Sequence, residues 1–283
     1  ERERAQTIER LRPHHRLSIL LKVAGMARST FYYQIKQSKL PDKYAREKEE
    51  ITSIFHEHKG RYGHRRITVE MKNRGYIINH KTTIKLMKIC GIKCRVRLRK
   101  YRSYRGETGK IAPNLLERNF LADKPNQKWV TDLTEFSLFG KKLYLSPIMD
   151  LYNREIISYN ISDRPTFYQT MQMIDQAFKR LPYETGLILH SDQGWQYQMK
   201  RYQHKLQQKG IRQSMSRKGN CLDNAVIENF FGLLKSELLY LQEFKSIEHF
   251  RKEIEEYIEY YNNKRIKTGL NNMSPVQYRT HSF

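Results

Sequence analysis

Cysteines, long apolar runs and an apolar leader are scarce or missing in this sequence of 283 residues. Three cysteines are too few for a disulfide framework and are typical of a chain that folds in a reducing compartment. No run of 18 or more apolar residues occurs, so the sequence predicts no membrane-spanning helix. The first residues are charged, which does not fit a secretory signal. We therefore expect a cytoplasmic protein without a membrane partner.

Basic residues, in contrast, are abundant and unevenly distributed. The formal net charge is +24, and residues 1–110 contain 29 Lys and Arg against 10 Asp and Glu. Residues 111–283 contain 24 against 19. A basic front part beside a nearly balanced remainder is typical of a chain that binds nucleic acid. A merely solvated basic surface and a membrane-surface protein fit less well, because the excess is segregated and no long amphipathic basic helix occurs.

The basic front part predicts two pairs of short helices. We expect these helices over residues 17–23, 27–37, 65–74 and 79–90. Two helices joined by a short turn that contains glycine outline a helix-turn-helix, although plain packing elements share this spacing. We expect two helix-turn-helix-like domains over residues 1–42 and 43–92, with Arg65 and Arg66 among the DNA contacts.

Residues 93–110 are the densest basic run, and two tyrosines lie among its cations. Cations contact phosphates and release counterions, while aromatic rings stack on bases. A flexible linker that binds nothing specific is the alternative, and both interpretations are compatible. We expect a basic linker over residues 93–121. Its predicted DNA contacts are Arg95, Arg97, Arg99, Lys100, Arg102 and Arg105.

The remainder of the chain predicts a mixed sheet. Strand-forming patterns occupy residues 128–138, 143–149, 154–161 and 186–190, and a helical pattern over 167–180 precedes the last of them. Strands followed by a helix and a buried strand favour a mixed sheet with helices on its faces. Pro147 counts against the second strand. We expect a catalytic core over residues 122–245 and a C-terminal helical tail over 246–283.

Two acids occupy unusual positions in this predicted sheet. Asp132 lies inside an otherwise apolar strand, and Asp192 follows a buried strand at the end where sheet proteins often place ligands. A buried carboxylate without a partner is costly, and a bound cation removes that cost. A turn cap or an arginine partner would be the ordinary alternative for each acid.

A third acid lies on a helix that we expect to run from Asp223 or Asn224, as its cap, to about Leu241. Glu228 lies off the apolar stripe of this helix and shares a face with Lys235. Glu237 is nine positions after Glu228, about half a revolution away, so it cannot replace it. An exposed pair without a function is the alternative for Glu228 and Lys235.

Three stretches of the chain resemble the motifs of DDE transposases and retroviral integrases, namely WVTDLT (129–134), HSDQGWQY (190–197) and NAVIENFFGLLKSEL (224–238). The 35 residues between Asp192 and Glu228 match the second spacing of that superfamily. More narrowly, RYGHRRI (61–67) and YYNNKRIKTGLNNMSPVQY (260–278) resemble the OrfB-type transposases of the "insertion sequence three" family. Lys267 departs from that family's tail signature, which often has a histidine there.

The resemblance implies an α/β fold related to ribonuclease H, with a mixed five-stranded sheet. It implies two Mg²⁺ ions, replaceable by Mn²⁺, held by Asp132, Asp192 and Glu228, and a contact from Lys235 to DNA near the scissile phosphate. The implied reaction is metal-dependent cleavage at insertion-sequence ends followed by 3′-OH strand transfer. The implied partners are double-stranded DNA, as terminal inverted repeats and target, and further copies of the chain, at the bacterial nucleoid. A metal-dependent nuclease without joining activity and a catalytically silent DNA-binding regulator are the alternatives.

Overall fold

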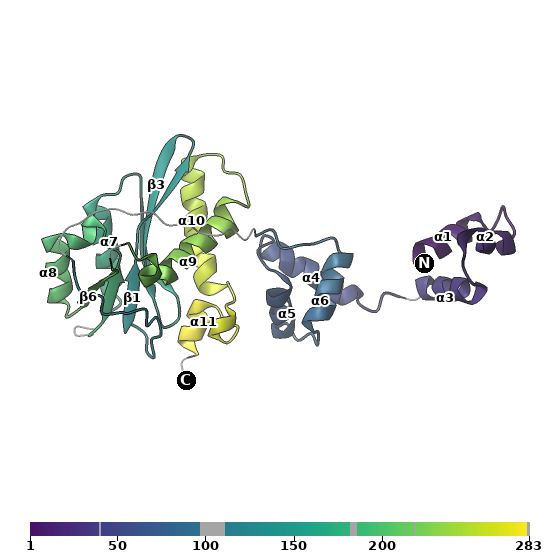
Figure 1. Ribbon diagram of the computed structural model, residues 1–283, viewed down its shortest axis with the longest axis horizontal. Helices are drawn as coiled ribbons and strands as arrows, with labels where there is room; N and C mark the ends of the chain where they lie inside the picture. Colours follow the sequence, from purple (N-terminus) through teal and green to yellow (C-terminus); the bar gives the residue numbers. More distant parts are fainter. Residues whose placement is uncertain (40, 97–110, 182–185, 218, 282–283) are drawn as a thin grey trace. The chain divides into compact units, whose positions relative to one another are not determined.

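The computed structural model describes residues 1–39, 41–96, 111–181, 186–217 and 219–281 (Figure 1). The chain forms two compact units, Glu1–Cys94 and Arg95–Phe283. The first unit is helical in its described residues, and the second contains the sheet. No helix in the described part of the chain is long and apolar enough to cross a membrane.

The first three helices have a small core of their own. They are α1 (Arg2–Leu11), α2 (Leu17–Ala24) and α3 (Arg28–Lys39). Their buried residues are Ala5, Ile8, Leu21, Phe31 and Ile35. Gly25 ends α2 with a φ of +60°, a left-handed conformation that glycine adopts without a steric penalty. The two helices and the glycine turn expected here are therefore confirmed.

The next three helices are α4 (Ala45–Glu57), α5 (His64–Asn73) and α6 (His80–Ile89). Asn79 caps α6, because its side chain accepts a hydrogen bond of 2.9 Å from the backbone N–H of Thr82. Arg74, just after α5, forms ion pairs with Glu50 and Glu57 of α4. These bonds fix the end of α5 against α4.

The second unit is built on a mixed sheet of six strands. They are β1 (Lys128–Thr131), β2 (Thr134–Leu138), β3 (Lys141–Asp150), β4 (Ile156–Ser162), β5 (Ile188–Ser191) and β6 (Arg212–Met215). β3 pairs antiparallel with β1, β2 and β4, whereas β5 is parallel to both β1 and β6. β1 and β2 pair with β3 in one continuous register, so the six strands occupy five positions. The predicted mixed sheet is confirmed, but it has six strands and not the expected five, because β1 and β2 are separate strands.

The single strand predicted over 128–138 is wrong at Asp132 and Leu133, which interrupt it between β1 and β2. Asp132 Oδ1 accepts a 2.7 Å hydrogen bond from the N–H of Leu133, which removes that donor from the ladder. The continuous register places Asp132 opposite Pro147, which has no N–H to donate. Pro147 nevertheless lies within β3, so its effect is to release Asp132 from the sheet rather than to end β3.

Helices cover both faces of the sheet (Figure 1). On one face, α7 (Phe167–Phe178) and α8 (Lys200–Gln208) pack on a cluster that includes Trp129, Ile148 and Leu189. On the other, α9 (Ala225–Leu234) and α10 (Ile247–Asn263) pack on a cluster that includes Val130. Trp129 and Val130 are neighbours in β1 and point to opposite faces, as strand geometry requires. The helix expected to reach Leu241 instead continues after α9 as the π-helical turn η3 (Lys235–Leu239).

The C-terminal segment belongs to the same compact unit as the sheet. α11 (Pro275–Thr280) follows the short η4 turn (Thr268–Leu270) and begins with a capping box at Ser274. Arg279 of α11 forms ion pairs with Asp150 and Glu155, at the end of β3 and the start of β4. The chain therefore returns to the edge of the sheet after α10.

Candidate active site

The three predicted acids lie at one end of the central strands. Asp132 directly follows β1, and Asp192 directly follows β5. Because β1 and β5 are adjacent and parallel, their carboxyl ends meet at the same edge of the sheet. Glu228 lies in the first turn of α9. The Nδ2 atom of Asn224, one turn before Glu228, donates a 3.3 Å hydrogen bond to the carbonyl of Thr131, so the start of α9 is joined to the end of β1.

The charges of the three acids act on one another. Burial raises the pKa of Asp132 well above its ordinary value, and the charges of Asp192 and Glu228 raise it further. Burial also raises the pKa of Asp192. Within the described ranges, neither Asp132 nor Asp192 forms an ion pair with a basic side chain. The sequence predicted a cost of this kind, and no basic side chain of the described residues offsets it for Asp132 or Asp192.

The turn after Asp192 leaves little room for a side chain at Gly194. The N–H of Gly194 donates a 2.9 Å hydrogen bond to Asp192 Oδ1, which fixes the carboxylate. A Cβ at Gly194 would lie 2.9 Å from that same oxygen and 2.6 Å from Gln196 Nε2, closer than real side chains pack. Buried Tyr197 lies close by, since the charges of Asp192 and Asp132 add to the burial that raises its pKa.

Asn224 is a component of the site that sequence reasoning placed only as a helix cap. It precedes α9, but its side chain forms no capping hydrogen bond, because it is directed to Thr131 instead. The residue is 3% exposed, and its Oδ1 has no hydrogen-bond partner among the described residues. Its position four residues before Glu228, at the start of the motif over 224–238, is the signal in the sequence that links it to this acid.

Asp223, the other predicted cap, is used differently. Its buried carboxylate accepts hydrogen bonds of 2.8 Å from Arg118 Nε and 2.9 Å from Arg217 Nε, and a third of 3.1 Å from Asn114. These donors, Arg217 foremost, lower the pKa of Asp223 far below its ordinary value. The network ties the loop before α9 to the segment before β1 and thus fixes where α9 begins.

Lys235 lies at the junction of α9 and the π-helical turn. Its Nζ is 5.7 Å from the ring centroid of Phe136 in β2, a cation–π contact. Burial lowers the pKa of the Lys235 amine. Glu237, which the helix phase excluded as a substitute for Glu228, is buried and accepts two hydrogen bonds of 2.6 and 2.8 Å from Arg265. Glu237 therefore belongs to the packing of the unit and not to the site.

A divalent cation fits the chemistry of the three acids. Carboxylate oxygens are the ligands that Mg²⁺ prefers, and a cation would offset both the burial and the mutual repulsion. Across the described parts of the chain, no three His, Cys, Asp or Glu side chains form a ready-made metal-binding group. The fit therefore lies in the charge and the donor type of the three acids.

The other predicted DNA contacts lie in or after the helical unit. Arg65 is exposed on α5, and Arg66 lies with its guanidinium carbon 5.6 Å from the ring centroid of Tyr62. Arg95 is exposed beyond α6. The remaining predicted contacts lie outside the described residues: Arg97, Arg99, Lys100, Arg102 and Arg105.

Comparisons with known proteins identify the family. Residues 122–221 and 228–283 match models of the integrase core domain, and residues 43–100 match a helix-turn-helix-like domain. A putative transposase for insertion sequence element IS150 of Escherichia coli K12, InsK, is 51% identical over 278 residues, which cover 98% of each chain. The chain belongs to the insertion-sequence transposases. The transposase InsF for insertion sequence IS3A of the same organism is 36% identical over 81% of this transposase and 80% of InsF. The predicted family resemblance is thereby confirmed.

Among solved structures, the catalytic core domain of HTLV-2 integrase in complex with magnesium has a TM-score of 0.41 at 17% identity. That similarity covers 55% of the transposase and 97% of the integrase domain. The two integrase-core matches are separated by residues 222–227, which include the first turn of α9, and Glu228 is the first residue of the second match.

Proposed function

We propose that this transposase cleaves DNA at the ends of its insertion sequence and joins the released 3′-OH to target DNA, with Asp132, Asp192 and Glu228 as its catalytic acids. The observation that supports this most directly is the position of the three acids at one sheet edge, where two of them have raised pKa values and no basic partner. The family assignment supports the reaction class.

In this proposal the three carboxylates hold divalent cations, two Mg²⁺ ions with Mn²⁺ as a substitute. Such ions would stabilise the entering and leaving oxygens of an in-line displacement at phosphorus. Neighbouring residues of the chain position the three acids and add a cation. The Gly194 N–H orients Asp192, Asn224 joins the end of β1 to the start of α9, and Lys235 offers a cation on the helix of Glu228.

Each chemical step exchanges one phosphodiester oxygen for another. Water first attacks phosphorus at the end of the element, and the 3′-oxygen leaves as a free hydroxyl. That hydroxyl then attacks a phosphodiester of the target, whose own 3′-oxygen leaves. No covalent protein intermediate is needed, so no serine or tyrosine nucleophile is assigned.

We propose duplex DNA as the partner, namely the terminal inverted repeats and the target, bound by a homo-oligomer at the bacterial nucleoid in the cytoplasm. The helix-turn-helix-like match over 43–100 and the basic run over 93–110 support DNA binding. If the run contacts phosphates, neutralising several of its Arg and Lys should weaken binding and flatten its salt dependence. An unchanged salt slope would reduce the run to a linker.

The catalytic assignment is tested by single isosteric variants. Asp132→Asn, Asp192→Asn and Glu228→Gln should each lower Mg²⁺-dependent cleavage and joining by about 10³-fold or more, equal to about 4 kcal/mol of barrier. Glu135→Gln is the matched control, because Glu135 is an exposed acid of β2 paired only with surface groups. Duplex binding, measured by fluorescence anisotropy, should persist in all four variants.

Near-normal strand transfer by any one of the three variants would remove that residue from the assignment. The products formed by the wild-type chain identify the reaction class. Cleaved DNA ends without joined product would indicate a nuclease, and DNA binding without either product would indicate a silent regulator.

A further inference from the structure

Two arginines meet at the buried carboxylate of Asp223. Arg118 Nε and Arg217 Nη2 both donate hydrogen bonds to Asp223 Oδ1, at 2.8 and 3.0 Å, and Arg217 Nε donates to Oδ2 at 2.9 Å. The two guanidinium groups therefore adjoin the same oxygen atom. We call these three residues, Arg118, Arg217 and Asp223, the Asp223 clamp. Two cations against one carboxylate leave the clamp with a net positive charge.

The Asp223 clamp is closed on its acidic side and open on its basic side. The Asp223 carboxylate is buried, whereas the side chains of Arg118 and Arg217 are 43% and 60% exposed. Arg118 also donates a hydrogen bond of 3.0 Å to Asn220. A guanidinium has more N–H donors than these bonds use, so each arginine keeps donors that no described residue accepts. Because the side chains are exposed, these donors are open to an external acceptor.

The backbone at Arg118 has an uncommon conformation. Glu117 and Arg118 have φ values of +46° and +63°, in the left-handed region that residues with a side chain rarely adopt. Asn114 fixes this turn, because its Oδ1 accepts hydrogen bonds from the N–H groups of Leu116 and Glu117. Its Nδ2 donates to Asp223, which joins the turn to the clamp. Strain that neighbouring bonds maintain in this way is typical of functional positions.

The position of Arg217 is fixed relative to Asp192. The N–H of Ser216, the residue before Arg217, donates a 2.9 Å hydrogen bond to the carbonyl of Ser191. The side chain of Gln193 donates another of 2.9 Å to the carbonyl of Ser216. Both sequence neighbours of Asp192 are thus bonded to the residue before Arg217. Arg217 therefore lies at the same edge of the sheet as this acid.

Asp223 is joined to the other strand of the site. The next residue, Asn224, bonds to the carbonyl of Thr131, which directly precedes Asp132. The Asp223 clamp is thus anchored beside both acids that follow the central strands. A DNA strand carries a phosphate at every nucleotide. When one phosphate lies at the acids, a neighbouring phosphate of the same strand passes close to the clamp.

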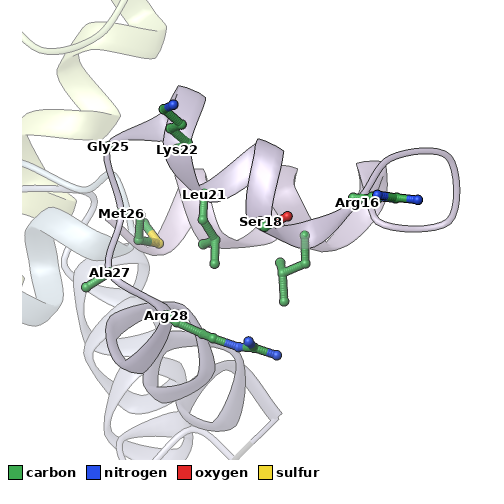
Figure 2. Close-up of a pocket in the computed structure, with 9 residues that line it drawn as sticks. Arg16, Ser18, Leu21, Lys22, Gly25, Met26, Ala27 and Arg28 are labelled. Carbon is green, nitrogen blue, oxygen red and sulfur yellow. The ribbon is translucent and has the colours of Figure 1, made fainter.

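A basic pocket in the helices α1–α3 differs from the clamp in one respect. This pocket, of about 760 Å³, is lined by Arg16 and Arg28, among other residues (Figure 2). Both arginines are exposed, and neither forms an ion pair with an acid of the described residues. No buried carboxylate therefore fixes their guanidinium groups together, as Asp223 does in the clamp.

We propose that Arg118 and Arg217, held by Asp223, bind one backbone phosphate of the DNA strand that enters the active site, next to the phosphate that is cleaved. Guanidinium groups bind phosphate oxygens through paired N–H donors. Because Asp223 fixes both groups in advance, little side-chain freedom is lost on binding. The ligand is a phosphodiester, so the inference rests on the proposed function and adds to it a positioning contact outside the three acids.

The Asp223 clamp is tested by binding of the chain to a terminal-repeat duplex, measured by fluorescence anisotropy over a salt series without divalent cations. Loss of one arginine leaves one cation against one carboxylate, so the clamp loses its net charge. Arg118→Gln and Arg217→Gln should therefore each reduce the slope of log K against log salt by about 0.9. Unchanged slopes in both variants would overturn the proposal.

Arg180→Gln is the matched control for the salt series. Arg180 is 52% exposed and paired with the buried acid Glu155, so the change removes a similar arginine from the same unit. Glu155 follows the end of β3, and the register of β3 with β1 places that end opposite the start of β1, away from Asp132. The control should keep the wild-type slope. A control that flattens the slope as much as Arg217→Gln would overturn the assignment.

Neutral methylphosphonate groups, placed at one phosphate of the duplex at a time, locate the contact. In the wild type, one such substitution close to the cleaved position should weaken binding by about tenfold. In the double variant Arg118→Gln, Arg217→Gln, the same substitution should have no further effect, because the contact is already lost. If every substitution weakened binding equally in both proteins, the two arginines would contact no particular phosphate and the proposal would fail.

Arg217→Lys separates phosphate binding from a purely structural role. Lysine keeps the positive charge but not the paired donors, so this variant should keep most of the slope and bind more tightly than Arg217→Gln. An equal loss of slope in the two variants would assign Arg217 to the fold alone and overturn the proposal. Circular dichroism and urea denaturation verify the fold of each variant. Because binding is measured without a divalent cation, failure of the clamp is distinct from failure of strand transfer.

Discussion

Asp132 and Asp223 are carboxylates of the same unit, and the chain surrounds them in opposite ways. Asp223 is fully buried and bonded to Arg118 and Arg217, which lower its pKa. Asp132 has no basic partner within the described chain, and burial with two neighbouring acids raises its pKa. Arginine side chains thus offset the buried charge of Asp223, whereas no described basic side chain offsets that of Asp132.

Glu237 resembles Asp223 in having a basic partner, since it is 2% exposed and paired with Arg265. Asp150 is also paired, with Arg279, but burial raises its pKa nevertheless. Each of these acids joins segments that are distant in the sequence. The acids at the ends of β1 and β5 differ from all three, because they have no such partner among the described residues. Groups of that kind are candidates for function.

The largest expected effect on stability is at the pair of Glu237 and Arg265. Arg265→Leu leaves the Glu237 carboxylate buried without its partner, so we expect a loss of about 3–5 kcal/mol in the free energy of unfolding. Urea denaturation followed by circular dichroism measures it. The double variant Glu237→Leu, Arg265→Leu should recover most of the loss, because no buried charge remains.

Lys142→Leu is the control for that experiment. Lys142 and Glu135 form an exposed ion pair, which contributes little, so the change should stay within about 1 kcal/mol. If Arg265→Leu lowered the free energy of unfolding no more than this control, the buried pair would have no special structural role. Glu237 could then no longer be grouped with Asp223.

A smaller effect, about 2 kcal/mol, is expected for Asp223→Asn, which weakens the charge-assisted bonds to Arg118 and Arg217. Since the folded pKa is lowered, Asp223 contributes stability above its unfolded pKa of about 4 and loses that contribution as the pH falls below it. The wild-type chain should therefore lose stability more steeply between about pH 4 and pH 2 than the variant. Equal slopes in acid titrations of the two proteins would contradict the assignment.

The turn at Asp192 gives a prediction about activity. Gly194→Ala places a Cβ 2.9 Å from Asp192 Oδ1 and should displace the carboxylate, so we expect strand transfer to fall about tenfold, equal to about 1.4 kcal/mol. Gly269→Ala is the control, because a Cβ there meets nothing within 4 Å. Urea denaturation should show little change for either variant. Unaltered strand transfer by Gly194→Ala would mean that the carboxylate tolerates displacement.

The sequence was sufficient to predict α2, α3, α5 and α6 and the strands from β1 to β5, because these depend on local periodicity, caps and turn residues. It did not predict α1 or β6. It was insufficient for the interruption at Asp132, which depends on Pro147 in the neighbouring strand. It also gave no sign that Asp223 would bond to Arg118, since 105 positions separate the two residues. The role of Asn224 likewise depends on Thr131 in β1, which lies 93 positions earlier in the sequence.

The smallest effect is the most direct contrast with Asp223. The pKa of Asp132 is raised in the folded chain, so its ionisation destabilises the fold as the pH rises above the unfolded value of about 4. Asp132→Asn should therefore raise the free energy of unfolding at pH 7 by about 1 kcal/mol in chelator, as measured in urea. Asp123→Asn, at an exposed acid of the same unit, should change nothing. Added Mg²⁺ should stabilise the wild type more than Asp132→Asn, because a ligand that binds only the folded state stabilises it. A variant less stable than the wild type in chelator would show that Asp132, like Asp223, holds the fold together.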